Sequence, residues 1–323
     1  MYTKLLNLSE IKNYDELIDN SYNGTCFAYK WFLKLKKCDT VLAIYSSKDD
    51  IISVMPLFKN NSDKIIFQST MYIPYGGFII LKLPTEERNK IKFIRELEKK
   101  YIDYFTSNYT KVNFSTDPKI EDIMPFIRSG FTPELRYTYK IDLTIGIDNI
   151  YKNFGSDRKK DIKKALKQGY KFIVDNDNGL FDVQKSMKWE KNYGNDSTVE
   201  FVKKYINKSI KENKGMNFIT MDNDGKVAGG VHLTWDTNTA YILYSYYEKK
   251  QDDVAIAFIY YNMIKYLIND TKIKELDFEG SVFESIENWN ISFGAYQSRF
   301  YNLHWNKEKS TYSNLYDYGE KNG

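Results

Sequence analysis

The chain has 323 residues, enough to build two hydrophobic cores, so two domains are expected. With 42% hydrophobic and 16% aromatic residues the composition is globular, and a net charge of only +4 does not match a dedicated nucleic-acid-binding protein, so no DNA partner is expected. Two cysteines and two histidines exclude a structural zinc cluster, and the chain has no signal-peptide core or long apolar run, so we expect a cytoplasmic protein without metal or membrane insertion.

The first half of the chain predicts one α/β domain, which we assign to residues 1–145. The hydrophobic periodicity and the turn signals predict, in order, a weak helix after Ser9, a helix over 27–37, strands over 40–47, 51–59 and 64–72, a long helix from about residue 85, a strand over 112–115, a helix over 121–129 and a strand over 135–143. Thr85 is the expected N-cap of the long helix.

A glycine loop follows the third of these strands. Tyr75, Gly76 and Gly77 are candidate substrate-binding residues, because glycine lets a ligand approach the backbone closely. We expect the loop to face the cleft between the domains, where ligand sites are common. A plain strand-to-helix turn is the alternative.

A strongly basic helix separates the two halves. It runs from about Phe154 to Gly169, whose glycine is the expected C-cap. Phe154, Ile162 and Leu166 are expected to face the protein, and the lysines to face outward. The basic side is either an ordinary solvated face or a surface that gathers a phosphate-rich ligand, with Arg158 and Lys159 as candidate substrate contacts.

The second half, residues 146–323, repeats the order of the first. The expected elements are helices over 181–192 and 199–212, strands over 216–221, 227–235 and 240–247, a helix over 253–268, a strand over 274–279, a short helix and a strand over 300–305. The repeated order indicates a duplicated α/β domain.

The strand over 274–279 has one apolar and one acidic face. Leu276 and Phe278 alternate with Glu275, Asp277 and Glu279, and Gly280 follows. Carboxylates at the end of a strand beside a glycine break are well placed to reach a ligand. A half-buried strand that shows its polar face to water is the alternative reading.

Three segments carry a resemblance to a known family. They are the basic helix 158–169, the run Asp277-Phe-Glu-Gly280, and the pair Phe293-Gly294. Together with the order of elements, they resemble the Fem-type branch of the GNAT N-acyltransferase superfamily, over residues 27–305. The resemblance implies an α/β (α+β) fold of two tandem GNAT-like domains, each a mixed twisted sheet flanked by helices.

Two departures from this family bear on the substrates. Fem-type proteins often have a lysine in a Phe-Lys-x-x-Phe-Gly run, where this chain has Asn290, and the chain lacks the long coiled-coil insertion of several tRNA-using members. Both differences favour an acyl-CoA donor and a small acceptor.

The resemblance places the acyl-CoA site in the C-terminal domain. Backbone groups of the strand over 244–247 are expected to contact the pantetheine, and the next helix N-terminus to hold the phosphates. The residues implied are Ser245, Tyr246, Tyr247, Lys249, Lys250, Gln251 and Ala255. The loop departs from the family pattern because it contains no glycine.

Amide formation requires a proton acceptor and positioned substrates. Glu279 and Asp277 are the first candidates for a base, and His232 on a neighbouring strand is the next. Asn290 and Ser281 can hydrogen-bond a substrate. Trp289 and Trp305 are either core residues or platforms for a sugar or nucleobase.

The leading functional prediction is an acyl-CoA-dependent N-acyltransferase. Its acceptor would be the amine of a dTDP- or UDP-linked amino sugar for surface polysaccharide such as lipopolysaccharide. The first alternative is a Fem-like peptidyltransferase of peptidoglycan precursors, the only case in which tRNA is a partner. The second is a non-catalytic binding module with the same fold.

Overall fold

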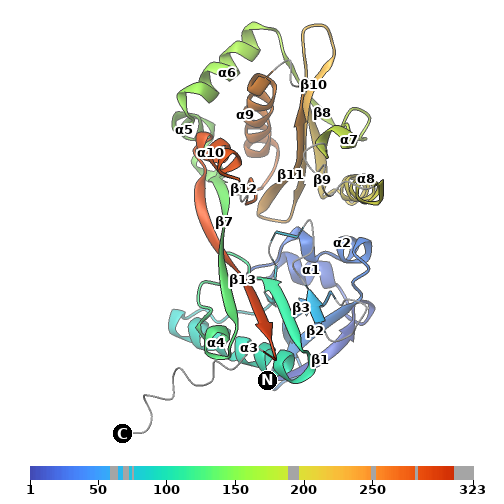
Figure 1. The fold of residues 1–323 in the computed structure, drawn as a ribbon, viewed down its shortest axis with the longest axis vertical. Helices are drawn as coiled ribbons and strands as arrows, with labels where there is room; N and C mark the ends of the chain where they lie inside the picture. Colours follow the sequence, from blue (N-terminus) through green and yellow to red (C-terminus); the bar gives the residue numbers. More distant parts are fainter. Residues whose placement is uncertain are drawn as a thin grey trace. The chain divides into compact units, whose positions relative to one another are not determined.

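The computed structural model describes residues 1–58, 65–67, 73–74, 76–187, 196–248, 252–280 and 283–308. The chain forms two compact units, coloured by sequence in Figure 1. The first contains residues 1–136 together with the described residues from Arg299 onward, and the second contains residues 137–298.

The first unit is built on an antiparallel sheet with strand order β1-β2-β3-β5. Its strands are β1 (Tyr2–Asn7), β2 (Thr40–Tyr45), β3 (Ile51–Pro56) and β5 (Ile79–Ile80). The interior residues of β2 and β3 are buried, because both are apolar runs packed in the middle of the sheet. Asp49, with a left-handed φ of 60°, lies in the turn between these two strands.

A second group of strands in this unit lies around β6 (Lys111–Ser115). It pairs in parallel with β4 (Ile65–Phe67) and antiparallel with β13 (Tyr296–Asn306). The helices of the unit are α1 (Tyr14–Asp19), α2 (Lys30–Leu35), α3 (Glu87–Asn108) and α4 (Met124–Arg128), with 3-10 turns at Leu8–Glu10 and Cys26–Ala28. Helix α3 contributes Leu97, Tyr101 and Phe105 to the core, and β13 contributes Leu303 and Trp305.

The second unit contains an antiparallel meander with a parallel neighbour. The order is β8 (Lys171–Asp175), β9 (Gly215–Met221), β10 (Val227–Trp235), β11 (Thr239–Tyr247), β12 (Glu275–Asp277) and β7 (Thr132–Asp142). Only the β11–β12 pair is parallel in this group. A parallel pair needs a crossover connection, and the helix α9 (Asp252–Asp270) provides it.

Helix α9 supplies much of the core of this unit. Ile259, Met263 and Ile264 belong to one buried cluster with residues of the meander and with Leu276 of β12. The other helices are α5 (Ile147–Asn153), α6 (Ser156–Lys167), α7 (Val183–Ser186), α8 (Asp196–Lys211) and α10 (Glu284–Ser292), with a 3-10 turn at Leu143–Ile145. Among the helices of the described residues, none has the length and apolarity needed to cross a membrane.

Two strands begin in one unit and end in the other. β7 and β13 pass from one unit to the other at residues 136/137 and 298/299. The division therefore differs from the expected one at residue 145. The C-terminal part of β13 belongs with the first unit because it pairs with β6 there.

In the second half, the predicted meander, the helix after it, the strand at β12, the short helix and the last strand are confirmed, but α5 and the strand β8, which pairs with β9, were not predicted. The described part of the helix predicted over 181–192 is only α7. The first half differs from the prediction in its strands. The predicted third meander strand, 64–72, is wrong: the described part of this segment is β4, which pairs with β6. The place beside β3 is taken by β5, which is only two residues long. Strand β1, which was not predicted, covers the outer edge of β2.

Two local predictions about helices are also wrong. The N-cap of α3 is Glu86, not Thr85, and no side chain caps the helix there. Leu166 of α6 is 60% exposed and does not face the core, because the buried positions of this helix are Ile162 and Ala165. Gly169 ends the segment in a left-handed conformation with φ of 73°, as the C-cap prediction requires.

Candidate active site

The second unit has an open strand edge next to a buried pair of carboxyl groups. The parallel pairing of β11 with β12 ends at Tyr241 opposite Asp277. β11 continues to Tyr247, and among the described residues no strand pairs with this edge beyond Tyr241. Backbone N–H and C=O groups on such an edge need hydrogen-bonding partners, which a bound ligand can supply.

A bulge lies in this part of β11. His232 of β10 is opposite Tyr244, but the next residue, Leu233, is opposite Ile242, so Leu243 is the extra residue. A bulge bends the strand and increases its twist, and this one follows directly after Tyr241, where the pairing of β11 with β12 ends.

The predicted pantetheine-contacting residues have different surroundings. The Tyr246 ring packs against Phe181 with a centroid distance of 5.3 Å, and its hydroxyl accepts a hydrogen bond from the Asp182 backbone N–H at 3.2 Å. Burial raises the pKa of Tyr246 to about 12. The Ser245 side chain hydrogen-bonds Tyr260 of α9, whereas Tyr247 is 48% exposed. Of these three residues, Tyr247 is the most accessible to a ligand.

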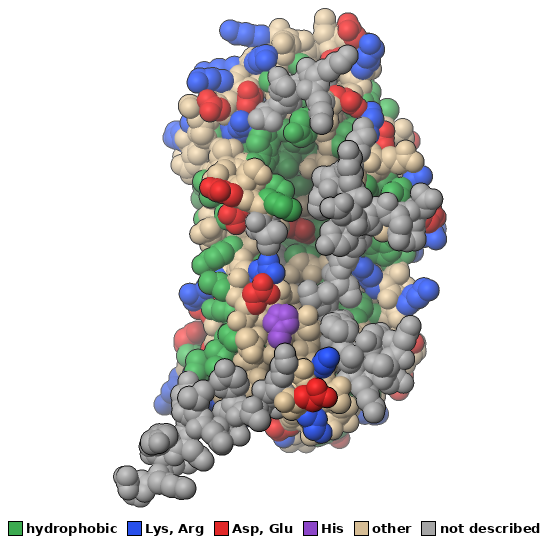
Figure 2. All heavy atoms as spheres, in the orientation of Figure 1, with side chains coloured by type: hydrophobic (Ala, Val, Ile, Leu, Met, Phe, Trp, Pro, Cys, Tyr) green, Lys and Arg blue, Asp and Glu red, His purple; other side chains and the backbone are tan. Residues whose placement is uncertain are grey.

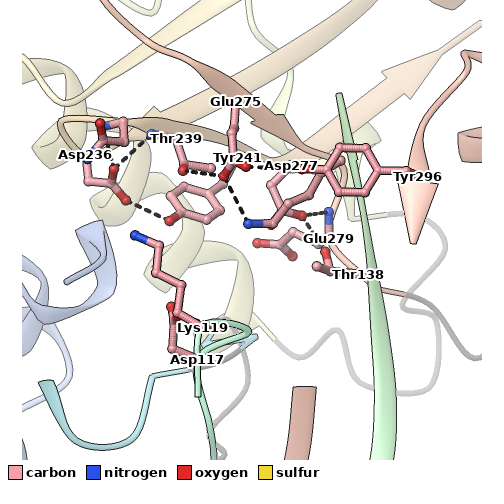
Figure 3. Close-up of polar contacts among 12 residues, drawn as sticks. Asp117, Lys119, Thr138, Asp236, Thr239, Tyr241, Glu275, Asp277, Glu279 and Tyr296 are labelled. Carbon is pink, nitrogen blue, oxygen red and sulfur yellow. Dashed lines mark hydrogen bonds and ion pairs between the residues drawn. The ribbon is translucent and has the colours of Figure 1, made fainter. Parts of the chain in front are cut away.

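Asp277, the last residue of β12, is fully buried among hydrogen-bond donors (Figure 3). Its Oδ1 atom accepts hydrogen bonds from the Thr138 hydroxyl and from the Glu279 backbone N–H, the latter at 2.7 Å. The Lys140 ammonium lies 3.9 Å from Oδ2. Two hydrogen-bond donors on Oδ1 and an ammonium group near Oδ2 favour the ionised form of a carboxyl group.

Glu279 lies two residues further on, in a strained backbone conformation. Its φ of 62° is in the left-handed region, which is unusual for a residue with a long side chain. The residue is partly exposed, but its Oε1 atom is buried and has no hydrogen-bond partner among the described residues. Burial first, and then the charge of Asp277, raise the pKa of Glu279 well above its ordinary value. When it is ionised, a carboxyl group with a raised pKa is a stronger base than an ordinary glutamate.

A lysine from β7 connects the buried pair to a third carboxylate. Lys140 Nζ lies 3.1 Å from Glu275 Oε2, and the Tyr296 hydroxyl donates to Glu275 Oε1 at 3.1 Å. Burial favours the neutral form of Glu275, but Lys140, Tyr296 and Thr239 outweigh it, so the pKa of Glu275 is lowered. Glu275 is therefore a stable anion at the edge of the site.

The segment after the strand is held by aromatic rings. Phe293 contacts Phe278, Tyr260 and Trp289, with centroid distances of 6.1, 5.0 and 5.2 Å. Gly294, with φ of 75°, has no room for a side chain, since a Cβ atom would lie 2.7 Å from the Cβ of Asn153. The Phe-Gly pair thus fixes α10 against α9 and α5 by packing.

Asn290 and Arg158 lie on facing helices of this layer. Asn290 is 3% exposed, and its Nδ2 atom has no partner among the described residues. The guanidinium of Arg158 stacks on the Trp289 ring at 4.2 Å and lies 3.3 Å from Asp161. Arg158 and Trp289 therefore fasten the start of α6 to α10, an arrangement worth about 1–2 kcal/mol.

The remaining basic residues of α6 lie outside this contact. Lys159 donates to the Lys152 carbonyl at 2.8 Å, while Lys160, Lys163, Lys164 and Lys167 are exposed. Figure 2 shows Lys and Arg side chains gathered over the part of the molecule where α6 lies in Figure 1. The exposed face of α6 therefore carries lysines, whereas Arg158, the single arginine of this helix, packs against Trp289.

The other predicted site residues lie apart from the carboxyl pair. His232 is fully buried between Asn217, at 2.7 Å from Nδ1, and Ser209, at 3.1 Å from Nε2, and burial lowers its pKa to about 3. A neutral imidazole with both nitrogens engaged is a core residue, and a substrate does not reach it. Ala255 is also buried, in α9. Tyr75, Lys249, Lys250, Gln251 and Ser281 lie outside the described residues.

Three predicted residues belong to the first unit. Gly76 forms a bridge with Thr116, and a Cβ atom on Gly77 would lie 3.0 Å from the Ser115 carbonyl oxygen, so these glycines permit the loop to pass close to β6. Trp305 packs on Phe131 with a centroid distance of 6.1 Å and is 6% exposed. Trp305 is therefore a core residue.

Sequence reasoning missed Thr138 and Lys140. They alternate with Tyr139 and Ile141 on a strand that was predicted, so a polar face could have been noticed. Their partner strand could not, because β12 is about 140 residues away in the chain and short. In the described part of the chain, no group of three or more His, Cys, Asp or Glu side chains is arranged to hold a metal ion.

Comparisons with known proteins reveal similarity at the level of the fold. No protein-family model matches the chain, and no curated protein matches its sequence. The structure of FemX has a TM-score of 0.67 and 13% identity, over 93% of this chain and 97% of that one. A tandem GNAT protein from the clavulanic acid biosynthesis pathway has a TM-score of 0.52 and 8% identity, over 94% and 98%. A GNAT-family acetyltransferase from Colwellia psychrerythraea has a TM-score of 0.53 and 9% identity, over 94% and 99%.

These similarities extend over nearly the whole of each chain, so they concern both units and not one shared domain. At 8–13% identity they establish the architecture and not the substrates. The α/β architecture, with sheets flanked by helices, agrees with the resemblance found in the sequence. The protein has a Fem-type, tandem GNAT-like fold.

Proposed function

We propose that this protein is an N-acyltransferase that forms an amide between an activated acyl group and an amine. One observation supports this proposal most strongly. The β11–β12 pairing ends at Tyr241 and Asp277, which leaves an unpaired backbone edge beside the carboxyl groups of Asp277 and Glu279. The edge offers hydrogen-bond donors to an acyl carbonyl. The carboxyl pair offers a proton acceptor to the attacking amine.

The reaction needs one proton acceptor and correct alignment. The acceptor substrate arrives as an ammonium group and gives one proton to the Glu279 carboxylate. The neutral amine attacks the acyl carbon, the C–N bond forms, and the C–S bond of a thioester donor breaks. The remaining proton of the adduct nitrogen goes to the departing thiolate, and Glu279 returns its proton to water. Alignment of two substrates contributes about 7–11 kcal/mol and the base about 3–5 kcal/mol.

For the substrates we propose an acyl-CoA donor and a nucleotide-linked amino sugar. Asn290, at the position where Fem-type proteins often have lysine, supports this choice, because its buried amide is a neutral hydrogen-bonding group and not a phosphate-binding cation. The exposed lysines of α6 offer a surface for the diphosphate of the sugar nucleotide.

Release of free thiol tests this proposal. An acyl-CoA mixed with dTDP- or UDP-linked amino sugars should yield colorimetrically detectable CoA thiol only when both substrates are present. Mass spectrometry of the product should show the added acyl group. Thiol release that does not depend on the sugar, or none across the panel, would reject this substrate pair.

Aminoacyl transfer from charged tRNA onto a peptidoglycan precursor is the second candidate. The observation that favours it is the similarity to FemX, whose TM-score of 0.67 exceeds the 0.52 and 0.53 of the two GNAT proteins. Transfer of a labelled amino acid from charged tRNA to a lipid-linked muropeptide would decide for it. If calorimetry shows that a sugar nucleotide binds, but neither acyl-CoA nor charged tRNA is turned over, the protein is a non-catalytic binding module.

A further inference from the structure

Lys140 lies at the centre of the charged groups that surround the carboxyl pair. Its side chain is only 10% exposed, and it lies 3.1 Å from Glu275 and 3.9 Å from Asp277. A lysine that is buried to this extent is costly unless its charge is compensated, and two carboxylates compensate it here. The position on β7 fixes it, because the β7–β12 register places Lys140 directly opposite Asp277.

The contacts of the two carboxyl groups are unequal. Asp277 has Thr138, Lys140 and the Glu279 N–H as partners. Glu279 has no partner for Oε1 among the described residues, and its N–H is the group that binds Asp277. Among the described residues, a cation therefore lies beside Asp277, and none lies within ion-pair distance of Glu279.

We propose that Lys140 is a positioning residue of the transfer site, where its ammonium group keeps Asp277 as a fixed anion, so that Glu279 alone exchanges protons with the acceptor amine. This inference rests on the proposed function for its role in the reaction, although the electrostatic part stands independently of it. Lys140 touches neither substrate in this account and acts through Asp277.

The other titratable groups near the pair are already engaged. Glu275 on β12 shares Lys140 and accepts from Tyr296 on β13, and the Tyr139 hydroxyl on β7 accepts from the Gln297 side chain at 3.0 Å. The Tyr241 hydroxyl on β11 donates to Asp236. Tyr260 on α9 hydrogen-bonds Ser245, and Glu287 on α10 hydrogen-bonds Tyr139. Lys140 lies within 4 Å of Asp277, so its removal directly changes the charge beside the pair.

The test is a direct titration of the pair by carbon-13 NMR, on protein labelled at the aspartate and glutamate carboxyl carbons. Comparison with E279Q and D277N assigns the two signals. In K140M the upper macroscopic pKa of the pair should rise by about one unit or more, because removing a cation makes the first proton easier to bind, whichever carboxyl group takes it. K140R should keep the wild-type value.

Two further variants separate charge from folding. The double variant K140M/D277N should have a lower pKa for Glu279 than K140M has, because the neighbouring anion is gone. K272M, which removes an exposed lysine in the loop before β12, should leave the titration unchanged. An upper pKa in folded K140M equal to that of the wild type would overturn the proposal.

This experiment needs no substrate, so it distinguishes the two claims. A raised pKa in K140M together with no acyl transfer from any donor would reject the proposed function and keep the electrostatic role of Lys140. Where transfer is observed, the rising limb of the kcat/KM profile should move to higher pH in K140M by the same amount as the NMR titration. If the NMR pKa rises in K140M but the rising limb of the kcat/KM profile does not shift, Lys140 has no role in the reaction.

Discussion

In the part of the chain that the structure describes, two acidic residues have buried oxygen atoms without a hydrogen-bond partner, and they differ in position. Glu279 lies at a strand end beside an open edge, whereas Glu98 lies in the middle of α3 within the core of the first unit. Both carboxyl groups have raised pKa values because burial disfavours the charged form. The same raised pKa therefore has different consequences at the two positions. Glu279 is a candidate base, whereas Glu98 lowers the stability of the fold.

Glu98 provides a stability test at this scale. Burial, followed by the charge of Asp122, raises its pKa to about 9, and Arg95 opposes this only in part. The folded state holds its proton more tightly than the unfolded state, so stability falls as the pH rises from the ordinary glutamate value toward 9. E98Q should therefore be more stable than the wild type by about 2–4 kcal/mol at pH 7.5, with little difference near pH 4.5.

Urea denaturation at several pH values measures this difference. The matched control is E96Q on the exposed side of the same helix, which should unfold like the wild type at every pH. An E98Q protein that gains no stability between pH 5 and pH 8 would show that the carboxyl group is ionised and compensated in the fold.

At the scale of elements, the site depends on how closely β10 and β11 approach each other. Gly229 and Gly230 of β10 lie opposite Tyr247 and Tyr246. A Cβ atom on Gly230 would lie 2.8 Å from the Tyr246 ring and 3.1 Å from Ile219 and Phe181. Glycine at this position leaves the space that the Tyr246 ring occupies.

G230A should accordingly destabilise the protein by about 1–3 kcal/mol, because the strand interior cannot accommodate the methyl group without displacing the ring. Thermal or urea unfolding measures the loss. G179A is the control, since its Cβ atom would meet only ordinary contacts of 3.5 and 3.9 Å. Equal stability of the two variants would contradict the close packing described for β10 and β11.

At the scale of the whole molecule, the two units share strands and are not consecutive in the sequence. The end of β13 supplies Leu303 and Trp305 to the core of the first unit and pairs with β6. A chain ending at Ser298 should therefore lose protection of the β6 amides in hydrogen exchange, because two large core side chains and a neighbouring strand are removed.

A chain ending at Glu308 is the control for this truncation, because it retains every strand pairing of β13. Its β6 amides should exchange as slowly as those of the full-length protein. Slow exchange of the same amides in the chain that ends at Ser298 would mean that the first unit is complete without its C-terminal strand.

The sequence predicted the local features of the site better than its long-range partners. The acidic strand end at Asp277 and Glu279, the glycine after α6 and the second meander all follow from short patterns with clear periodicity or turn signals. The pairing of β12 with β7 does not, since it joins residues far apart in the chain through a strand of three residues. Lys140 and Thr138 were missed for that reason.

The exposed and buried faces of α6 illustrate the same limit on a helix. Spacing alone allowed Leu166 to face the core, but the helix instead buries the small Ala165 against α9, where Val254 and Phe258 fill the contact. The short distance between α6 and α9 leaves room only for a small residue at this contact. This distance depends on tertiary packing, which cannot be predicted from the hydrophobic pattern of one helix.

The central claim is that Glu279 accepts the proton of an amine during acyl transfer. The direct measurement compares the rate of acyl transfer in the wild type, in E279Q and in the control E284Q, which changes an exposed residue at the start of α10. We expect E279Q to lose about 10²–10⁴-fold in kcat with unchanged substrate binding, and E284Q to keep the wild-type rate. Transfer by E279Q at the wild-type rate, across the pH range in which Glu279 titrates, would contradict this account.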